Sequence, residues 1–122
     1  MFFTSMIVAS LGGFVGSSGR YLTGIAAKKL FGDSYPWGTF VVNVLGCFII
    51  GVFFGFWTRH EMDPMMNALL ITGFCGGYTT FSSFSHDSYK MIVNGQWGKF
   101  FLYVIPSVAL GLLMVWLGMK CV

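Results

Sequence analysis

The chain has 122 residues, of which 56% are hydrophobic and only 9% carry a charge, and its mean hydropathy is +0.76. Soluble domains usually have about 25% charged residues, so this composition excludes an ordinary soluble domain and indicates an integral membrane protein. The net charge of +3 comes from scattered residues, with no basic cluster larger than Lys28-Lys29. The charge therefore gives no support to a nucleic-acid-binding function.

Four stretches lack Asp, Glu, Lys and Arg, and each is close to the roughly 20 residues that a helix needs to cross the hydrocarbon core. In chain order they are Phe2–Gly19, Ser34–Thr58, Pro64–Ser85 and Phe100–Met119. The sequence therefore predicts an all-α membrane protein with four transmembrane helices per subunit, forming one domain over residues 1–122. An even number of spans places both termini on the same side.

The first span is followed by Arg20, the one basic residue well away from the loops. Its side chain could extend to the membrane interface, or its charge could draw an anion into a vestibule, and the sequence leaves both readings open. The first two spans also contain small residues four positions apart, a pattern that lets membrane helices pack closely. These pairs are Gly12 with Gly16 and Gly51 with Gly55.

In the second span, Thr39 and Asn43 are four residues apart and share a helix face. Asn43 is the only carboxamide well inside this apolar run. An intramembrane asparagine can form hydrogen bonds between helices, and its NH₂ group is also an uncharged donor for an anion. Both interpretations stay open from the sequence.

The third span contains the most unusual segment, Gly73 to Ser85, in which Gly76-Gly77 is followed by Thr79-Thr80. This pattern favours a break in the helix near Gly76–Thr80, and freed backbone groups in a membrane must meet protein, water or an ion. A first half-helix ending near Gly76 presents carbonyl oxygens that suit a cation such as Na⁺. A second half-helix begins near Thr80, where a threonine can cap it.

The face of this second half-helix combines aromatic rings with hydroxyl groups. Phe81, Phe84 and Ser85 have helical spacing, and Ser82 lies beside them. Phenylalanine rings have electropositive edges, and serine hydroxyls donate hydrogen bonds, so this face can attract an anion. In the fourth span, Tyr103 and Ser107 are again four apart around Pro106 and serve either an anion or contacts between helices.

The loops give little orientation signal. Lys28, Lys29, Lys90 and Lys99 lie near one side, against Arg59 and Lys120 near the other. This small difference allows a mixture of orientations.

Two other classes of membrane protein fit the sequence less well. A small multidrug-type transporter needs an intramembrane carboxylate, and no Asp or Glu lies at the middle of a span. A non-transporting assembly subunit would leave the helix break unexplained. No hydrolase elbow, phosphate-binding loop, zinc spacing or catalytic triad supports an enzyme.

The motifs resemble those of the Fluc (CrcB) family of small fluoride channels over essentially the whole chain. The matching segments are Gly19-Arg20-Tyr21, Gly38 to Asn43 with Gly46, Gly73 to Ser85, and Tyr103 with Ser107. The third of these is highly specific. Gly111 occupies a fourth-span position where some relatives have a hydroxyl residue.

The resemblance implies a multi-pass protein of the plasma membrane that exports cytoplasmic fluoride passively. It implies an antiparallel, dual-topology homodimer with two pores along the interface. It also implies a central structural Na⁺ held by the backbone carbonyls of Gly76 and Thr79 from both subunits. The pore residues that it implies are Asn43, the phenylalanines Phe81 and Phe84, and a polar track of Thr39, Ser82, Ser85, Tyr103 and Ser107.

Overall fold

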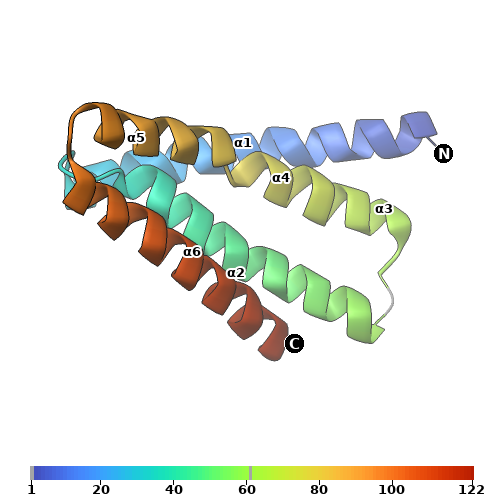
Figure 1. Ribbon diagram of the computed structural model, residues 1–122. Helices are drawn as coiled ribbons and strands as arrows, with labels where there is room; N and C mark the ends of the chain where they lie inside the picture. Colours follow the sequence, from blue (N-terminus) through green and yellow to red (C-terminus); the bar gives the residue numbers. More distant parts are fainter. Residues whose placement is uncertain (1, 61) are drawn as a thin grey trace.

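The computed structural model describes residues 2–60 and 62–122, and the described chain is helical apart from short connections (Figure 1). Two long helices come first and one comes last, and between them lies a segment made of shorter pieces. The elements are α1 (Phe2–Phe31), α2 (Trp37–His60), α3 (Pro64–Asn67), the π-helix η1 (Ala68–Cys75), α4 (Gly76–Tyr78), α5 (Phe81–Val93) and α6 (Trp97–Lys120).

Within the described residues, α1, α2 and α6 are each long and apolar enough to cross a membrane. The predicted third span corresponds to the broken segment from α3 to α5. Its first half packs against α1, and α5 follows after a short extended connection (Figure 1). Three of the four predicted spans are thus confirmed as long apolar helices, and the crossing of the interrupted third segment stays a prediction.

The end of α1 differs from the prediction that the first span closes at Gly19. The helix continues through Arg20 to Phe31, because neither Gly19 nor the residues after it interrupt backbone hydrogen bonding. It ends at Gly32, which has a φ of 89° and whose N–H donates to the Lys28 carbonyl oxygen at 2.8 Å. Glycine adopts this left-handed conformation without the usual steric cost and commonly ends helices in this way.

The helices pack in two close pairs, and the glycines predicted as packing faces lie in both contacts. A Cβ added at Gly12 or Gly16 of α1 would overlap backbone carbonyl oxygens of the third segment, at Leu69 and Phe74. On α2, a Cβ at Gly51 would overlap a carbonyl oxygen of α6. Backbones approach this closely only where no side chain intervenes, so these glycines determine which helices are neighbours.

The chain ends agree with the prediction from the number of spans. Figure 1 shows the start of α1 and the end of α6 toward the same end of the molecule. The connection from α1 to α2 and the connection from α5 to α6 lie together at the opposite end.

Candidate functional site

The break in the third segment lies at Thr79 and Thr80, which have extended backbone angles (φ −83°, ψ 158° and φ −146°, ψ 112°). The prediction of a break near Gly76–Thr80 is confirmed. The first half-helix ends at Tyr78, shortly after the predicted end near Gly76. Gly76 itself has helical angles (φ −62°, ψ −37°).

Packing requires glycine at only one of the two adjacent helical glycines. A Cβ at Gly77 would lie 2.6 Å from the Gly13 carbonyl oxygen of α1, so this position needs glycine for close approach. A Cβ at Gly76 would meet nothing within 4 Å. The threonines break the helix instead, because their β-branched, hydroxyl-bearing side chains favour extended backbone and offer the backbone other hydrogen bonds.

The last carbonyls of the first half-helix find different partners. The Cys75 carbonyl oxygen accepts from the Thr79 N–H at 3.0 Å and from the Thr79 hydroxyl at 2.9 Å. The Gly77 carbonyl oxygen accepts from Arg20 Nε at 3.1 Å. In a continuing helix the Gly76 carbonyl would accept from the Thr80 N–H, but that group donates to Asn43 Oδ1.

Asn43 holds the extended residue from both sides. Its Oδ1 accepts from the Thr80 N–H at 2.9 Å, and its Nδ2 donates to the Thr80 carbonyl oxygen at 3.1 Å. The inter-helix interpretation of this asparagine is therefore confirmed. An NH₂ group has two hydrogens, so one donor is left after this bond, and its use by an anion stays a prediction.

The second half-helix is capped as predicted. The Thr80 hydroxyl accepts from the Ser83 N–H at 3.2 Å, which satisfies one of the free donors at the start of α5. On this helix Phe81 is 78% exposed, and Ser82 and Ser85 are exposed as well. One helix face therefore presents an aromatic ring and two hydroxyls to the outside of the subunit.

An open cavity of about 320 Å³ lies beside the break and brings several of the predicted site residues together. Its walls include Asn43, Thr79, Phe81, Phe84 and Ser107. The Ser107 hydroxyl is buried and has no hydrogen-bond partner among the described residues. A buried hydroxyl in this state calls for a hydrogen-bond partner that the described part of the subunit does not supply.

Cys47 also lines this cavity, on the side of α6. A Cβ on Gly111 would lie 3.3 Å from Cys47 Sγ, so the absence of a side chain at Gly111 gives the thiol its space. At this point of the cavity wall, the chain therefore places a cysteine from α2 against a glycine from α6.

A line of aromatic rings connects the cavity to the loop end of the molecule. The ring centroids of Phe81 and Phe84 are 6.1 Å apart, those of Phe84 and Tyr103 are 5.1 Å apart, and those of Tyr103 and Tyr35 are 5.5 Å apart. Tyr103 is fully buried, and its hydroxyl donates to Asp87 Oδ2 at 3.3 Å. Tyr103 thus stands between the cavity and the loops.

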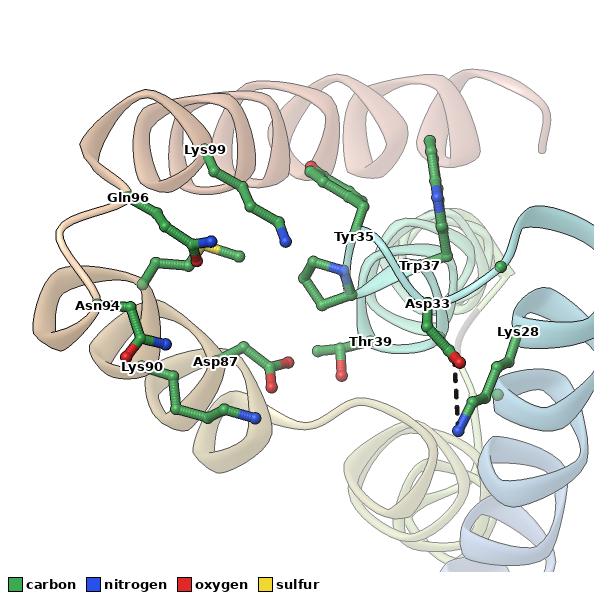
Figure 2. Close-up of a pocket in the computed structure, with 15 residues that line it drawn as sticks. Lys28, Asp33, Tyr35, Trp37, Thr39, Asp87, Lys90, Asn94, Gln96 and Lys99 are labelled. Carbon is green, nitrogen blue, oxygen red and sulfur yellow. Dashed lines mark ion pairs between the residues drawn. The ribbon is translucent and has the colours of Figure 1, made fainter.

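At the loop end there is a polar pocket of about 450 Å³, drawn in Figure 2. Thr39 and Asp87 line it, and three lysines from three different helices surround it: Lys28, Lys90 and Lys99. Lys28 forms an ion pair with Asp33 at 3.5 Å. Burial raises the pKa of the Tyr35 phenol in this pocket, so the hydroxyl stays protonated and donates to the Leu102 carbonyl oxygen at 2.9 Å.

The structure thus divides the predicted residues into three groups. The first lines the cavity. The second consists of Tyr103, whose ring lies against Phe84, and Thr39, which lines the pocket at the loops. Ser82 and Ser85 belong to the third group, on the exposed face of α5 and outside both spaces. Arg20 donates from Nε to the Gly77 carbonyl at the break and also lines a separate open cavity of about 250 Å³ with Lys28 and Thr39, so its role in attracting an anion stays a prediction.

Two functional contacts escaped the sequence reasoning. Asp87, which accepts from the Tyr103 hydroxyl, was not among the predicted site residues. Tyr78 is buried at the end of the first half-helix, and its hydroxyl donates to Thr23 Oγ1 at 3.0 Å. Both contacts join residues far apart in the chain, and a single polar residue on an apolar helix would have been the only signal for either.

Comparison with known proteins gives a consistent result. A family model described as CrcB-like protein, Camphor Resistance (CrcB), matches residues 7–119. A fluoride-specific ion channel FluC of Phocaeicola vulgatus is 44% identical over 114 residues, which cover 93% of this chain and 94% of the relative. The proteins of the same name from Flavobacterium psychrophilum and Rhizobium etli are 43% and 42% identical, over 90% and 93% of this chain and 90% and 91% of the relatives. With its break at Thr79–Thr80 and this match over nearly its whole length, the chain belongs to the CrcB family.

Proposed function

We propose that the protein is a fluoride-selective channel for passive export of cytoplasmic fluoride across the plasma membrane, and not an enzyme. Its relatives are named fluoride-specific ion channels, and three apolar helices provide the membrane setting. In this proposal two antiparallel subunits of dual topology enclose two pores along their interface. A structural Na⁺ lies at the centre of the dimer.

The unpaired Ser107 hydroxyl is the observation that carries the proposal. It is buried at the wall of the cavity that Asn43 and Phe84 also line. These groups are uncharged donors and an aromatic ring, so they can replace part of the hydration shell of a small anion without holding it permanently. Fluoride is small and strongly hydrated, and it is the anion that such a site suits best.

The aromatic rings lie along the proposed anion path, which runs from the cavity to the pocket at the loops. Phe81 and Phe84 bind the anion through their electropositive edges, and Tyr103 with Thr39 leads toward the pocket at the loops. The lysines of that pocket raise the local concentration of anions at the entrance. Ser82 and Ser85 complete the track from the exposed face of α5.

A second copy of the chain is the partner that this exposed face requires. Hydrocarbon cannot satisfy the hydroxyls of Ser82 and Ser85, and the large exposure of Phe81 beside them marks the same surface. Because the loop charges barely favour one orientation, both insertions can occur, and an antiparallel pair can form.

Na⁺ fits the carbonyl end of the break. The Gly76 carbonyl loses its helical partner to Asn43, and a Cβ at Gly76 would meet nothing within 4 Å of this subunit, so the backbone there is open. In the proposed dimer, Gly76 and Thr79 of each copy supply four carbonyl oxygens to a hard monovalent cation. The bound ion offsets repulsion between the opposed helix ends and balances anions in the adjacent pores.

Fluoride efflux from liposomes tests the function directly. Purified protein is reconstituted in fluoride-loaded vesicles, and release is followed with a fluoride electrode beside a matched chloride experiment. We expect rapid fluoride release and little chloride release. Fluoride release no faster than from protein-free vesicles would show that the proposed function is wrong.

Replacement of Na⁺ tests the cation. We expect prolonged exchange of Na⁺ for a large organic cation on both sides to slow fluoride efflux and to weaken the dimer, with recovery on return of Na⁺. Efflux and dimer stability that stay constant through this exchange would contradict a structural Na⁺.

A further inference from the structure

The carbonyl end of the first half-helix is tied to one stretch of α1 by two side-chain contacts. Arg20 Nε donates to the Gly77 carbonyl oxygen at 3.1 Å, and the Tyr78 hydroxyl donates to Thr23 Oγ1 at 3.0 Å. Arg20 and Thr23 are neighbours on one face of α1, because residues three apart in a helix lie side by side. The two contacts therefore act on the last two residues of the half-helix, immediately before the break.

The Tyr78 ring is buried and closely packed. The residue is 6% exposed, and its ring stacks on Phe74 with centroids 5.6 Å apart. A Cβ on Gly19 of α1 would lie 3.5 Å from this ring, and a Cβ on Gly46 of α2 would lie 3.3 Å from it. Two glycines from different helices thus make the slot into which the ring fits.

These contacts leave a specific carbonyl free. Of the carbonyls near the break, Cys75 O accepts from Thr79 and Gly77 O accepts from Arg20, whereas the helical donor of Gly76 O is diverted to Asn43. A guanidinium at the carbonyl end of a helix is also favoured by the negative end of the helix dipole. Arg20 therefore neutralises one side of this end and leaves the other side to a second cation.

We propose that Arg20, Thr23 and Tyr78 are positioning residues, here named the α1 clamp, which fix the direction of the Gly76 and Thr79 carbonyls and so determine how tightly Na⁺ is held. This inference rests on the proposed function. The clamp assigns Arg20 a structural cationic role at the break in place of a role in attracting the anion. It also gives Tyr78 a positioning role, which differs from the anion-binding role proposed for the pore residues.

The choice of arginine follows from the geometry. Nε lies within a planar guanidinium and donates in a fixed direction, whereas a lysine ammonium is a rotating point charge. Arg20→Lys keeps the positive charge and loses the directed bond to Gly77. Tyr78→Phe keeps the ring in its slot and loses only the bond to Thr23.

The experiment measures fluoride efflux as a function of Na⁺ concentration for the native protein, Arg20→Lys, Tyr78→Phe and Thr23→Val. The matched control is Tyr89→Phe, which removes the hydroxyl of a tyrosine that is 65% exposed on α5. We expect the Na⁺ concentration for half-maximal efflux to rise about tenfold in Arg20→Lys and about threefold in Tyr78→Phe, as loss of a charged or a neutral hydrogen bond implies. Efflux at saturating Na⁺ should return close to the native rate.

A second readout does not depend on transport. Na⁺ bound only to the folded dimer raises its thermal midpoint in detergent, and that shift should be reduced in the same order by the same variants. In the double variant Thr23→Val/Tyr78→Phe we expect the Na⁺ midpoint of the single Tyr78→Phe variant, because both changes remove the same bond.

The outcomes separate the two proposals. A native protein that conducts fluoride, with the same Na⁺ midpoint and the same thermal shift in all variants, overturns the clamp and leaves the channel. Additive effects in the double variant also overturn the pairing of Thr23 with Tyr78. Fluoride efflux absent from the native protein contradicts the channel itself, whereas the thermal shift still reports on the clamp.

Discussion

The two half-helices on either side of Thr79–Thr80 differ in what they bury and what they expose. The first, from α3 to α4, packs its backbone against α1 through glycines and buries Tyr78 and Cys75. The second, α5, has an exposed face of aromatic and hydroxyl side chains. The first half therefore presents backbone carbonyl groups in a fixed position, and the second presents aromatic and hydroxyl side chains. A broken helix allows both within one span.

The assignment of the first half-helix to backbone packing is tested most directly by changing Gly76 and Gly77 separately. Gly77→Ala adds a methyl group that would lie 2.6 Å from the Gly13 carbonyl oxygen, so we expect destabilisation of about 1–3 kcal/mol from overpacking. Gly76→Ala meets nothing within 4 Å inside the subunit and should leave subunit stability equal or slightly higher. Thermal unfolding in detergent measures both, and equal losses would contradict the assignment of Gly77 to packing.

The link between the halves is tested at Asn43. Asn43→Asp keeps the acceptor for the Thr80 N–H but sets an oxygen against the Thr80 carbonyl and can add a negative charge to the path. We expect fluoride efflux to fall by about 100-fold or more, as expected for losing a bond and placing a like charge beside the anion. Asn43→Ser keeps a donor and should retain part of the flux. If the aspartate variant forms the native dimer and conducts normally, Asn43 is purely structural.

The phenylalanines test the second half-helix. Phe84 packs on Tyr103 and lines the cavity, whereas Phe81 is largely exposed in the subunit. Replacing either with isoleucine removes the ring edge with a modest change of volume, and we expect a fall in flux of about tenfold for each, the equivalent of one favourable aromatic contact. Only Phe84→Ile should also lower subunit stability. Undiminished flux in both variants would contradict a role for the ring edges.

The smallest effect is expected at Ser107. Its hydroxyl has no partner among the described residues, so Ser107→Ala removes no bond and should leave stability unchanged or slightly raised. Fluoride efflux should fall about threefold to tenfold, because a donor for the anion is lost. A clear loss of stability with unchanged flux would indicate that the hydroxyl serves the fold through a bond not seen in the subunit.

Much of the architecture could be predicted because it depends on local composition. Charge-free stretches indicated the spans, and glycines four apart indicated that Gly12 and Gly51 lie on packing faces, although not which helix packs there. The exact end of the first half-helix could not be predicted in the same way. In the sequence, Gly77 looks like a helix breaker. In the structure it lies within a helix, and glycine is needed there because the Gly13 backbone lies directly against it.

The site was predictable as a set of residues but not as a set of contacts. Asn43 was recognised as exceptional in an apolar span, yet its bonds to Thr80 connect helices 37 residues apart in sequence. The partners of Arg20 and Tyr103 are 57 and 16 residues away in sequence. Such contacts depend on how helices are rotated against each other, and periodicity in one helix carries no information about its neighbour.

The position of the chain ends has a consequence for joining two copies into one polypeptide. The start of α1 and the end of α6 lie at the same end of the subunit (Figure 1). A short linker from the end of one copy to the start of the next would therefore insert both copies in the same orientation. A single-chain version of the proposed antiparallel pair needs an additional membrane-crossing helix as its linker. A gene fusion with that extra helix should conduct, and one with a short soluble linker should not.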